Sequence, residues 1–218
     1  MSTLPIDRPG KIFAVGLNYR DHVREAAVAE PKSPVLFTKW QNCLIGTNVP
    51  IIIPPGIDQV DWEAELAVII GREARDVGVD DALDFVHGYT CMNDVSARGV
   101  QLTEGQWSRA KSFDTFGPVG PRLVPASEIP DPQVLDIRSR VNGDVMQDSN
   151  TKHMIFSVAD LISFISHGIT LERGDLILTG TPGGVGSARP TPIFLQDGDV
   201  VEVEIDGIGT LANPVRNS

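Results

Sequence analysis

The sequence predicts an α+β fold whose core is mostly β-sheet. The chain of 218 residues is long enough to bury one full hydrophobic core. Its 21 glycines and 16 prolines indicate many turns between short strands. Segments with strand patterns outnumber helical segments and cluster late in the chain. A regular alternation of strand and helix is therefore excluded.

The first half of the chain contains five expected strands and two expected helices. Each strand is a short, mostly apolar run, and most end at a glycine, a proline or a polar residue. The expected strands lie at 11–16, 35–39, 51–53, 61–71 and 89–95. The expected helices lie at 18–29 and 80–86, the second with acidic residues in its first turn.

The second half of the chain begins with the strongest short hairpin signal. Asn142-Gly143 separates two strand candidates, 137–141 and 145–148, and this dipeptide favours a tight β-turn. A helix is predicted over 157–166, with Ser157 as its N-cap and Asp160 in the position of a capping box. Gly168 is expected to end that helix. Two further strands are expected at 175–179 and 200–205.

The composition excludes several classes of partner. The formal net charge is −11, so nucleic acid and membrane surfaces are not expected as partners. No apolar run reaches membrane-spanning length, and the N-terminus does not read as a secretion signal. Cys43 and Cys91 form no metal or redox motif, which predicts a cytoplasmic protein. An acidic small substrate is compatible with the charge, because a metal and a few lysines can invert the local potential.

Two glutamates stand at the start of the most apolar strand. Glu63 and Glu65 lie two residues apart, so their side chains point to the same face of a strand. Neighbouring carboxylates repel, and a divalent cation such as Mg²⁺, Mn²⁺ or Ca²⁺ would stabilise them. Asp94, at the end of the next strand, is a candidate third ligand. The alternatives are solvated surface acids for the pair and a turn or helix-capping role for Asp94.

Three further groups of polar residues have no obvious place in a core. Lys111 is a candidate substrate cation or acid–base group, or its stem covers an aromatic ring with the ammonium in water. His22 and Glu25, three residues apart, form either a general-base pair or a plain surface contact. The glycine-rich loop 179–186 can present backbone N–H groups to a carboxylate. It lacks the Lys-Ser/Thr of a phosphate-binding loop.

Together, and in this order, these segments resemble the fumarylacetoacetate hydrolase family. The resemblance runs from about Lys11 to near the C-terminus. The chain is similar to the short members made of the catalytic domain alone: acylpyruvate hydrolase, oxaloacetate decarboxylase and 2-hydroxyhepta-2,4-diene-1,7-dioate isomerase. The matching segments are Gly16-x-Asn18-Tyr19-x-x-His22-x-x-Glu25, Pro31-x-x-Pro34-x-x-Phe37-x-Lys39, 61–71, 88–90, 93–98, 111–116 and 174–182.

The resemblance implies a fold, an assembly and a set of residue roles. The fold is a mixed-sheet roll or barrel with short flanking helices, forming one catalytic domain over 11–218 after an extension at 1–10. The assembly is a homodimer. Glu63, Glu65 and Asp94 are the implied ligands of Mg²⁺ or Mn²⁺. His22 and Glu25 are implied to activate a water, on a segment that becomes ordered over the substrate, and Lys111 is implied to lie near the reacting carbonyl. The implied substrate contacts are Arg98, Gln101, Gly180 and Thr181.

The implied substrate is a small 2-oxo acid. The expected reaction is hydrolysis of the C3–C4 bond of a 2,4-dioxo acid through a metal-stabilised pyruvate enolate, because the His22/Glu25 pair is present. Decarboxylation of oxaloacetate and isomerisation of a 2-hydroxydienedioate use the same enolate and are the alternatives. A non-catalytic carboxylate-binding protein should have lost His22, Glu25 or Lys111. Gly99 replaces an acid that relatives often carry beside Arg98, which leaves the placement of this arginine open.

Overall fold

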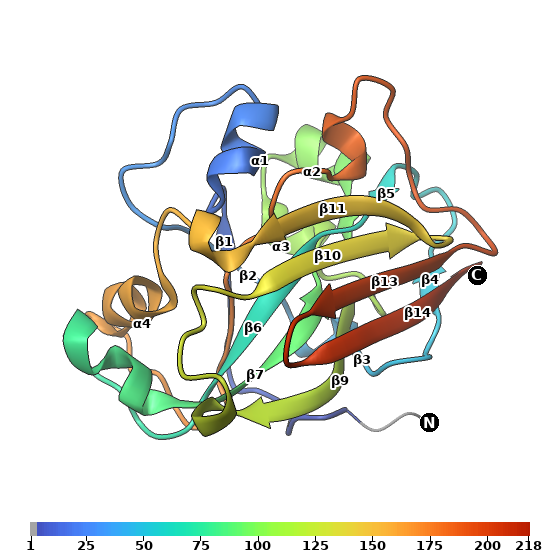
Figure 1. Cartoon of the computed structure of the whole chain (residues 1–218). Coiled ribbons are helices and arrows are strands. Elements are labelled where there is room, and N and C mark those ends of the chain that lie inside the picture. The colour runs from blue at the N-terminus through green and yellow to red at the C-terminus, as the bar shows by residue number, and fades with distance from the viewer. Residues whose placement is uncertain (1–3) are drawn as a thin grey trace.

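The computed structural model describes residues 4–218 and confirms the expected fold class: an α+β arrangement of curled sheets with few helices (Figure 1). A seven-stranded mixed sheet has the order β2-β1-β12-β6-β7-β9-β3, and a five-stranded sheet has the order β11-β10-β13-β14-β4. The strands of the first sheet are β1 (Ile12–Gly16), β2 (Val35–Thr38), β3 (Leu44–Ile45), β6 (Ala64–Ile70), β7 (Val86–Asn93), β9 (Gly117–Pro125) and β12 (Leu176–Leu178). Those of the second are β4 (Ile51–Ile53), β10 (Asp136–Val141), β11 (Asp144–Asn150), β13 (Val200–Ile205) and β14 (Gly209–Asn217), while β5 (Val60–Asp61) pairs with β8 (Ser96–Ala97).

Strand β6 lies at the centre of the hydrophobic core. Every residue of β6 is buried, and successive side chains point to opposite faces of the sheet. Leu66, Val68 and Ile70 pack into a cluster that includes the inner faces of β10 and β13. Ala67 and Ile69 pack into a second cluster on the other face. The strand that follows the two glutamates is therefore held on both sides.

The helices are short and lie outside the sheets (Figure 1). Helix α4 begins at the predicted capping box, in which Ser157 and Asp160 each accept a hydrogen bond from the backbone N–H of the other. Gly168 follows its end with a positive φ, as predicted. No helix in the described part of the chain is long and apolar enough to cross a membrane. The helices are α1 (Arg20–Glu25), α2 (Arg98–Glu104), α3 (Trp107–Ala110), α4 (Val158–Ser166) and the 3₁₀ turns η1 (Gln41–Cys43), η2 (Val79–Phe85), η3 (Ala126–Glu128), η4 (Thr151–His153) and η5 (Gly186–Ala188).

Three expected elements have different bounds in the structure. The helix expected at 18–29 is limited to α1, because residues 26–30 are largely exposed and Ala27 has a φ of 54°. The helix expected at 80–86 is the 3₁₀ turn η2. The strand expected at 89–95 is β7, which ends at Asn93 because the chain turns there. The hairpin of β10 and β11 forms where it was predicted.

Two long strands were missed because prolines interrupt them. Strand β9 contains Pro118, Pro121 and Pro125, and β14 contains Pro214. Proline removes a ladder donor, so a sequence pattern with several prolines argues against a strand. The structure places two of these prolines at ladder ends: Pro125 is the last residue of β9, and Pro214 faces Val200, the first residue of β13.

Candidate active site

The register of β6 and β7 brings three buried carboxylates together. Ala64 on β6 pairs with Asn93 on β7, so Glu63 and Asp94 are adjacent where the two strands end. The Asp94 N–H donates to the Glu63 carbonyl at 2.9 Å. Glu65, two residues from Glu63, points to the same side, and one oxygen of each carboxylate lies within 4.8 Å of the others. The structure therefore gathers all three predicted metal ligands, each at most 6% exposed.

Two buried lysines contact this acidic cluster. The Lys111 ammonium lies 2.8 Å from Glu63 Oε2, 2.8 Å from Asp94 Oδ2 and 2.7 Å from Ser96 Oγ. The alternative of a Lys111 ammonium in water is therefore wrong. Lys39 Nζ lies 2.8 Å from Asp94 Oδ1 and also donates to the Lys111 carbonyl oxygen. Burial lowers the pKa of Lys111, but the carboxylates of Asp94 and Glu63 outweigh this effect and raise the pKa.

Glu65 has a different environment from its two neighbours. Its Oε2 accepts the Gly180 N–H at 2.8 Å, and no Lys or Arg side chain within residues 4–218 forms an ion pair with it. Burial, with Asp94 and Glu63 nearby, holds the pKa of Glu65 well above its usual value. A buried carboxylate without a cation is costly, and three carboxylates suit Mg²⁺ or Mn²⁺. The residues present therefore fit a divalent cation.

Asp61 is a central residue of the site that the sequence did not indicate. It is fully buried and accepts four hydrogen bonds. Three come from the backbone N–H groups of Trp62, Gly186 and Ser187, at 2.7 to 3.0 Å. The fourth comes from Arg98 Nε at 2.8 Å. Asp61 thus connects the end of the glycine-rich loop with the first turn of α2.

Arg98 is held firmly although Gly99 lacks an acidic side chain. Asp61 fixes its Nε, and a second guanidinium nitrogen lies 2.7 Å from Glu63 Oε1. The remaining terminal nitrogen donates to Gln101 Oε1 at 2.9 Å. Such forked contacts fix both the position and the plane of the guanidinium. The open question of how Arg98 is placed is answered by Asp61.

A small cavity of about 120 Å³ lies beside the acidic cluster. It brings together five of the predicted catalytic and substrate-contacting residues with one predicted metal ligand and an apolar wall. Gly180, also predicted to contact substrate, is not among the lining residues. Its N–H donates a hydrogen bond to Glu65 Oε2. The lining residues are His22, Glu63, Arg98, Gln101, Lys111 and Thr181, together with Val15, Gly16, Leu17, Phe37 and Trp107.

His22 faces the cavity from α1, and Glu25 lies beside it without lining the cavity. His22 Nδ1 lies 3.6 Å from Glu25 Oε2, and the same carboxylate oxygen accepts the Gly184 N–H at 2.9 Å. Burial raises the pKa of Glu25, but His22 and the Gly184 N–H outweigh it and lower the pKa. Neither side chain is fully exposed. The alternative of a plain surface contact does not describe this pair.

Helix α1 is docked on the body of the protein by its other side chains. Asp21 accepts from the Gly183 N–H at 3.2 Å and from Ser149 Oγ at 2.5 Å. Arg20 donates to the Met154 carbonyl at 2.6 Å. These contacts place the segment that was expected to close over substrate against the glycine-rich loop and β11.

Gln147 is a second residue that the sequence did not indicate. Its amide nitrogen donates to Thr181 Oγ1 and to the Pro182 carbonyl, both at 2.8 Å. Its amide oxygen accepts from the Ala64 N–H at 3.0 Å. Gln147 on β11 therefore fixes Thr181 beside the strand that carries Glu65. The predicted hairpin is what brings this glutamine to the site.

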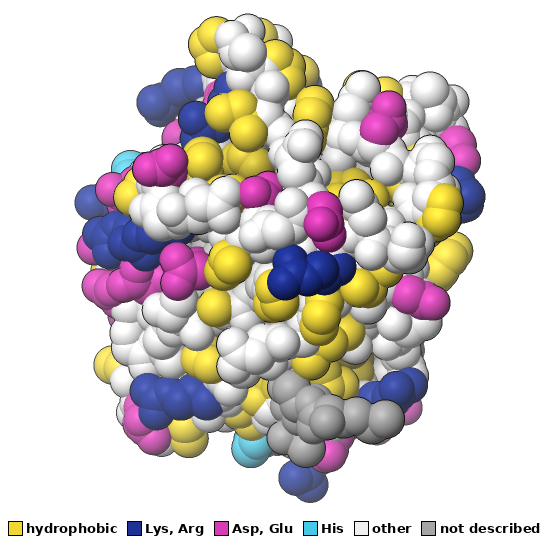
Figure 2. All heavy atoms as spheres, turned by 90° about the vertical axis from the view of Figure 1, so that its right-hand side faces the viewer, with side chains coloured by type: hydrophobic (Ala, Val, Ile, Leu, Met, Phe, Trp, Pro, Cys, Tyr) yellow, Lys and Arg dark blue, Asp and Glu magenta, His cyan; other side chains and the backbone are white. Residues whose placement is uncertain are grey.

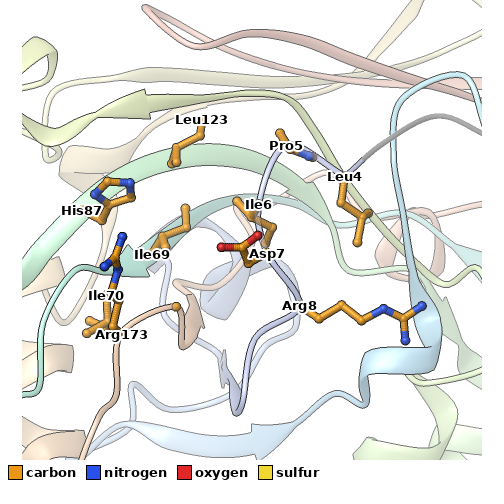
Figure 3. Close-up of a pocket in the computed structure, with 11 residues that line it drawn as sticks. Leu4, Pro5, Ile6, Asp7, Arg8, Ile69, Ile70, His87, Leu123 and Arg173 are labelled. Atoms are coloured by element: carbon orange, nitrogen blue, oxygen red, sulfur yellow. The ribbon is translucent and has the colours of Figure 1, made fainter.

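Two other surfaces contrast with this cavity. A larger hollow of about 340 Å³ lies where the N-terminal segment crosses the sheet, and exposed Asp7, His87 and Arg173 project around it (Figure 3). Among the described residues that line it, Asp7 carries the one carboxylate. The face shown in Figure 2 carries acidic side chains interspersed with Lys and Arg. The cavity at the acidic cluster is therefore the candidate active site.

The fold is a curled mixed sheet, and the site is a buried cluster of three carboxylates where β6 begins and β7 ends. The family described as fumarylacetoacetate hydrolase, C-terminal, matches residues 11–216, and the chain belongs to this family. The mitochondrial oxaloacetate tautomerase of Xenopus laevis is 49% identical over 213 residues, which cover 97% of this chain and 67% of that protein.

Solved structures of similar proteins agree with the fold. The 5-carboxymethyl-2-hydroxymuconate delta-isomerase of Mycobacterium smegmatis superposes with a TM-score of 0.87 at 45% identity, over 99% of this chain and 82% of that one. The 2-hydroxyhepta-2,4-diene-1,7-dioate isomerase of Mycobacterium marinum gives a TM-score of 0.86 at 46% identity, over 99% and 77%. Similar proteins named for an activity include this tautomerase, these isomerases and a fumarylacetoacetate hydrolase of Exiguobacterium antarcticum, which gives a TM-score of 0.89 at 42% identity over 97% of this chain and 76% of that one.

Proposed function

We propose that this chain is a divalent-metal-dependent enzyme that interconverts the enol and keto forms of oxaloacetate or a similar small 2-oxo acid. The arrangement that supports this most directly is His22, which lines the same cavity as Arg98 and Lys111 and has Glu25 beside it. A proton-transfer group thus lies beside two cations. The similarity to an oxaloacetate tautomerase moves this reaction ahead of the hydrolysis that the sequence favoured.

Each residue at the cavity can be given a role in this proton transfer. Arg98 binds a substrate carboxylate, and its guanidinium is oriented by Asp61. His22 gives a proton to C3 of the enol or takes one from C3 of the keto form, and the Glu25 carboxylate, 3.6 Å from Nδ1, stabilises the protonated imidazole. The proton gained at C3 balances the proton lost from the 2-hydroxyl, and no carbon–carbon bond breaks. A divalent cation at Glu63, Glu65 and Asp94 would supply Lewis-acid stabilisation of charge on the 2-oxygen.

Hydrolysis of a 2,4-dioxo acid is the second candidate, favoured by the orientation of Glu25. Because its carboxylate is fixed by the Gly184 N–H and lies against His22 Nδ1, the other imidazole nitrogen is available to a water. Water would add at C4, and cleavage of C3–C4 would release a carboxylic acid and pyruvate. Decarboxylation of oxaloacetate needs no water. A purely carboxylate-binding protein has no need of the His22/Glu25 pair.

One assay separates these reactions. The purified protein with Mg²⁺ or Mn²⁺ is given enol-oxaloacetate, keto-oxaloacetate and acetylpyruvate in parallel. We expect accelerated loss of the enol absorbance with no more CO₂ than the metal ion alone releases. Acetate production from acetylpyruvate would establish hydrolysis instead, and CO₂ release above that of the metal ion alone would establish decarboxylation. No turnover of any of the three would overturn the proposal.

We also propose that the protein forms a homodimer, as the family resemblance implied. Light scattering after size-exclusion chromatography should give the mass of two chains, and the mass of one chain would exclude the dimer. The cytoplasmic location and the division into an extension at 1–10 and a domain at 11–218 stay predictions.

A further inference from the structure

The lining of the cavity is divided by chemistry. The charged and polar lining groups, called here the polar side, include Arg98, Lys111 and Thr181 and can hold a carboxylate and a 2-oxo group. Phe37, Trp107 and the backbone of Gly16 form an aromatic wall that adjoins these groups at Lys111. The charged head of a 2-oxo acid is stabilised only on the polar side, because an unpaired carboxylate against aromatic rings loses its solvation. The remainder of the substrate therefore extends toward the aromatic wall.

Two aromatic rings form this wall from separate elements. Phe37 belongs to β2 and Trp107 opens α3, and their ring centroids lie 5.5 Å apart with an interplanar angle of 73°. This edge-to-face arrangement favours a fixed position for both rings. The Lys111 ammonium lies 5.3 Å from the centre of the Phe37 ring. The wall is thus fixed relative to the polar side of the cavity.

Gly16 allows the indole of Trp107 to lie directly against β1. A Cβ atom at position 16 would lie 2.3 Å from Trp107 Cζ3 and 3.1 Å from Cη2. The backbone of Gly16 does not have a left-handed φ, so glycine is required here only by the neighbouring ring. The pair of Gly16 and Trp107 sets how far the wall stands from the polar side.

We propose that Trp107, seated on Gly16 and backed by Phe37, limits the substrate to 2-oxo acids with a short chain. This inference rests on the proposed function, since it concerns the substrates of the same site. The cavity of about 120 Å³ is well below the roughly 300–1,000 Å³ of pockets that hold drug-sized ligands. The indole occupies the space that a longer chain would need. Trp107 is therefore a specificity-determining residue, and Gly16 is a positioning residue for it.

The test measures binding rather than turnover, so it does not depend on which reaction the enzyme catalyses. Dissociation constants for pyruvate, 2-oxobutanoate, 2-oxohexanoate and 2-oxooctanoate are measured by calorimetry with the full chain and saturating Mg²⁺. We expect the wild-type protein to bind 2-oxooctanoate at least about 10-fold more weakly than 2-oxobutanoate, because a single surplus methylene against an apolar wall already costs about 10-fold or more. Trp107→Ala should bring this ratio close to one, and Trp107→Phe should give an intermediate ratio.

Gly16→Ala tests the same wall from the opposite side. It should change the chain-length ratio in the wild-type background and leave it unchanged in the Trp107→Ala background, because the ring that the new methyl group displaces is then absent. Two controls should leave the ratio unchanged. Leu102→Ala removes an apolar side chain that is 80% exposed on α2, and Gly78→Ala adds a methyl group with no atom within 4 Å.

The outcomes separate this inference from the proposed function. Equal binding of short and long acids by the wild-type protein would overturn the size limit and leave the 2-oxo acid site intact. An unchanged ratio in folded Trp107→Ala and Trp107→Phe would overturn the role of Trp107. Gly16→Ala acting equally in both backgrounds would overturn its link to the indole. Failure to bind any of the four acids would count against the proposed function itself.

Discussion

The carboxylates and the base of the candidate site are positioned in two different ways. Glu63, Glu65 and Asp94 are placed by backbone pairing between β6 and β7, with the core packed on both faces of β6. His22 and Glu25 are placed by a six-residue helix held through side chains that reach backbone groups of a loop. The first region is part of the global fold. The second depends on a few contacts that can be lost without unfolding the sheet.

The largest expected effect comes from removing the charge of Glu65. Glu65→Gln keeps the shape of the side chain and its contact with the Gly180 N–H, but removes the one carboxylate of the cluster that lacks a cation. We expect the affinity for Mg²⁺ and Mn²⁺, measured by calorimetry, to fall by more than about 100-fold, since the loss of mere supporting partners already costs about 10–100-fold. Activity should be abolished with it.

Glu128→Gln is the matched control, because Glu128 is exposed on η3. A second readout is thermal: a bound ion stabilises only the folded state, so Mg²⁺ should raise the Tm of the wild-type and Glu128→Gln proteins but not of Glu65→Gln. Unchanged metal affinity in Glu65→Gln would contradict the assignment of this acidic cluster as a metal site.

The next effect separates the base from the carboxylates. Changing His22 to Ala should reduce tautomerisation, or acylpyruvate cleavage, by about 10²–10⁴-fold, the usual range for a lost acid–base group. Loss of CO₂ from oxaloacetate needs no base and should fall much less. Metal affinity should be unchanged, because His22 lies on α1 and not on the sheet. These are measured as kcat for each substrate and as a calorimetric Kd for Mg²⁺.

His153→Ala, which removes an exposed histidine on η4, is the control for this variant. Equal losses of decarboxylation and proton transfer would mean that His22 serves substrate binding or the docking of α1. A simultaneous loss of metal affinity would mean that the two regions are not separable, and the comparison between them would fail.

The carboxylates on the sheet could be predicted from the sequence, for a physical reason. A period of two residues puts Glu63 and Glu65 on one face of a strand, and an apolar run marks that strand as buried. The capping box at Ser157 and the turn at Asn142-Gly143 are equally local signals. Each of these depends on residues that are neighbours in the chain.

The missed residues act through partners far away in the chain. Asp61 meets Gly186 and Ser187 more than 120 positions later, and Gln147 meets Thr181 across 34. Nothing in the local pattern around Asp61 distinguishes a buried acceptor of four hydrogen bonds from the start of an ordinary strand. Lys39 belongs to a matched family segment, yet its contact with Asp94 appears only in the folded chain.

A smaller effect is expected from Asp61, which joins Arg98 at the acidic cluster to the loop on which α1 is docked. Asp61→Asn places an amide NH₂ among the N–H donors of Arg98, Gly186 and Ser187, so at least one charged hydrogen bond is lost. Such a bond contributes about 1.5–3 kcal/mol, which corresponds to roughly a 10-fold rise or more in KM when Arg98 no longer faces the substrate carboxylate. We expect kcat to change less than KM.

Asp144→Asn, at the exposed start of β11, is the control. If kcat falls while KM is unchanged, Asp61 supports the chemical step rather than the orientation of Arg98. A lower Tm without any change in KM would assign Asp61 a structural role only.

The smallest effect concerns the docking of α1 and its dependence on pH. Glu25 accepts the Gly184 N–H, and the net influence of burial, His22 and this N–H lowers the pKa of Glu25. A carboxyl group whose pKa is lower in the docked state favours docking above its ordinary pKa, and that contribution is lost as the pH falls through the lowered value. The docked state should therefore persist through the ordinary Glu range, near pH 4.5, and open only below it.

Hydrogen exchange of the Gly184 amide and of the α1 backbone, followed while the pH is lowered, measures this opening after correction for the intrinsic exchange rate. The exchange-protected amides of β6 should stay protected over the same range, because that strand is held by pairing with β7 and β12 and by the apolar core on both of its faces. Glu25→Gln keeps an oxygen acceptor for the Gly184 N–H and has no proton to gain, so its α1 should open with a weaker dependence on pH.

The same pH dependence in Glu25→Gln would show that another group, such as Asp21 with its contact to Gly183, controls the docking. Simultaneous loss of protection in α1 and β6 would show that the helix opens only when the whole domain unfolds, and the two regions would then be one cooperative unit.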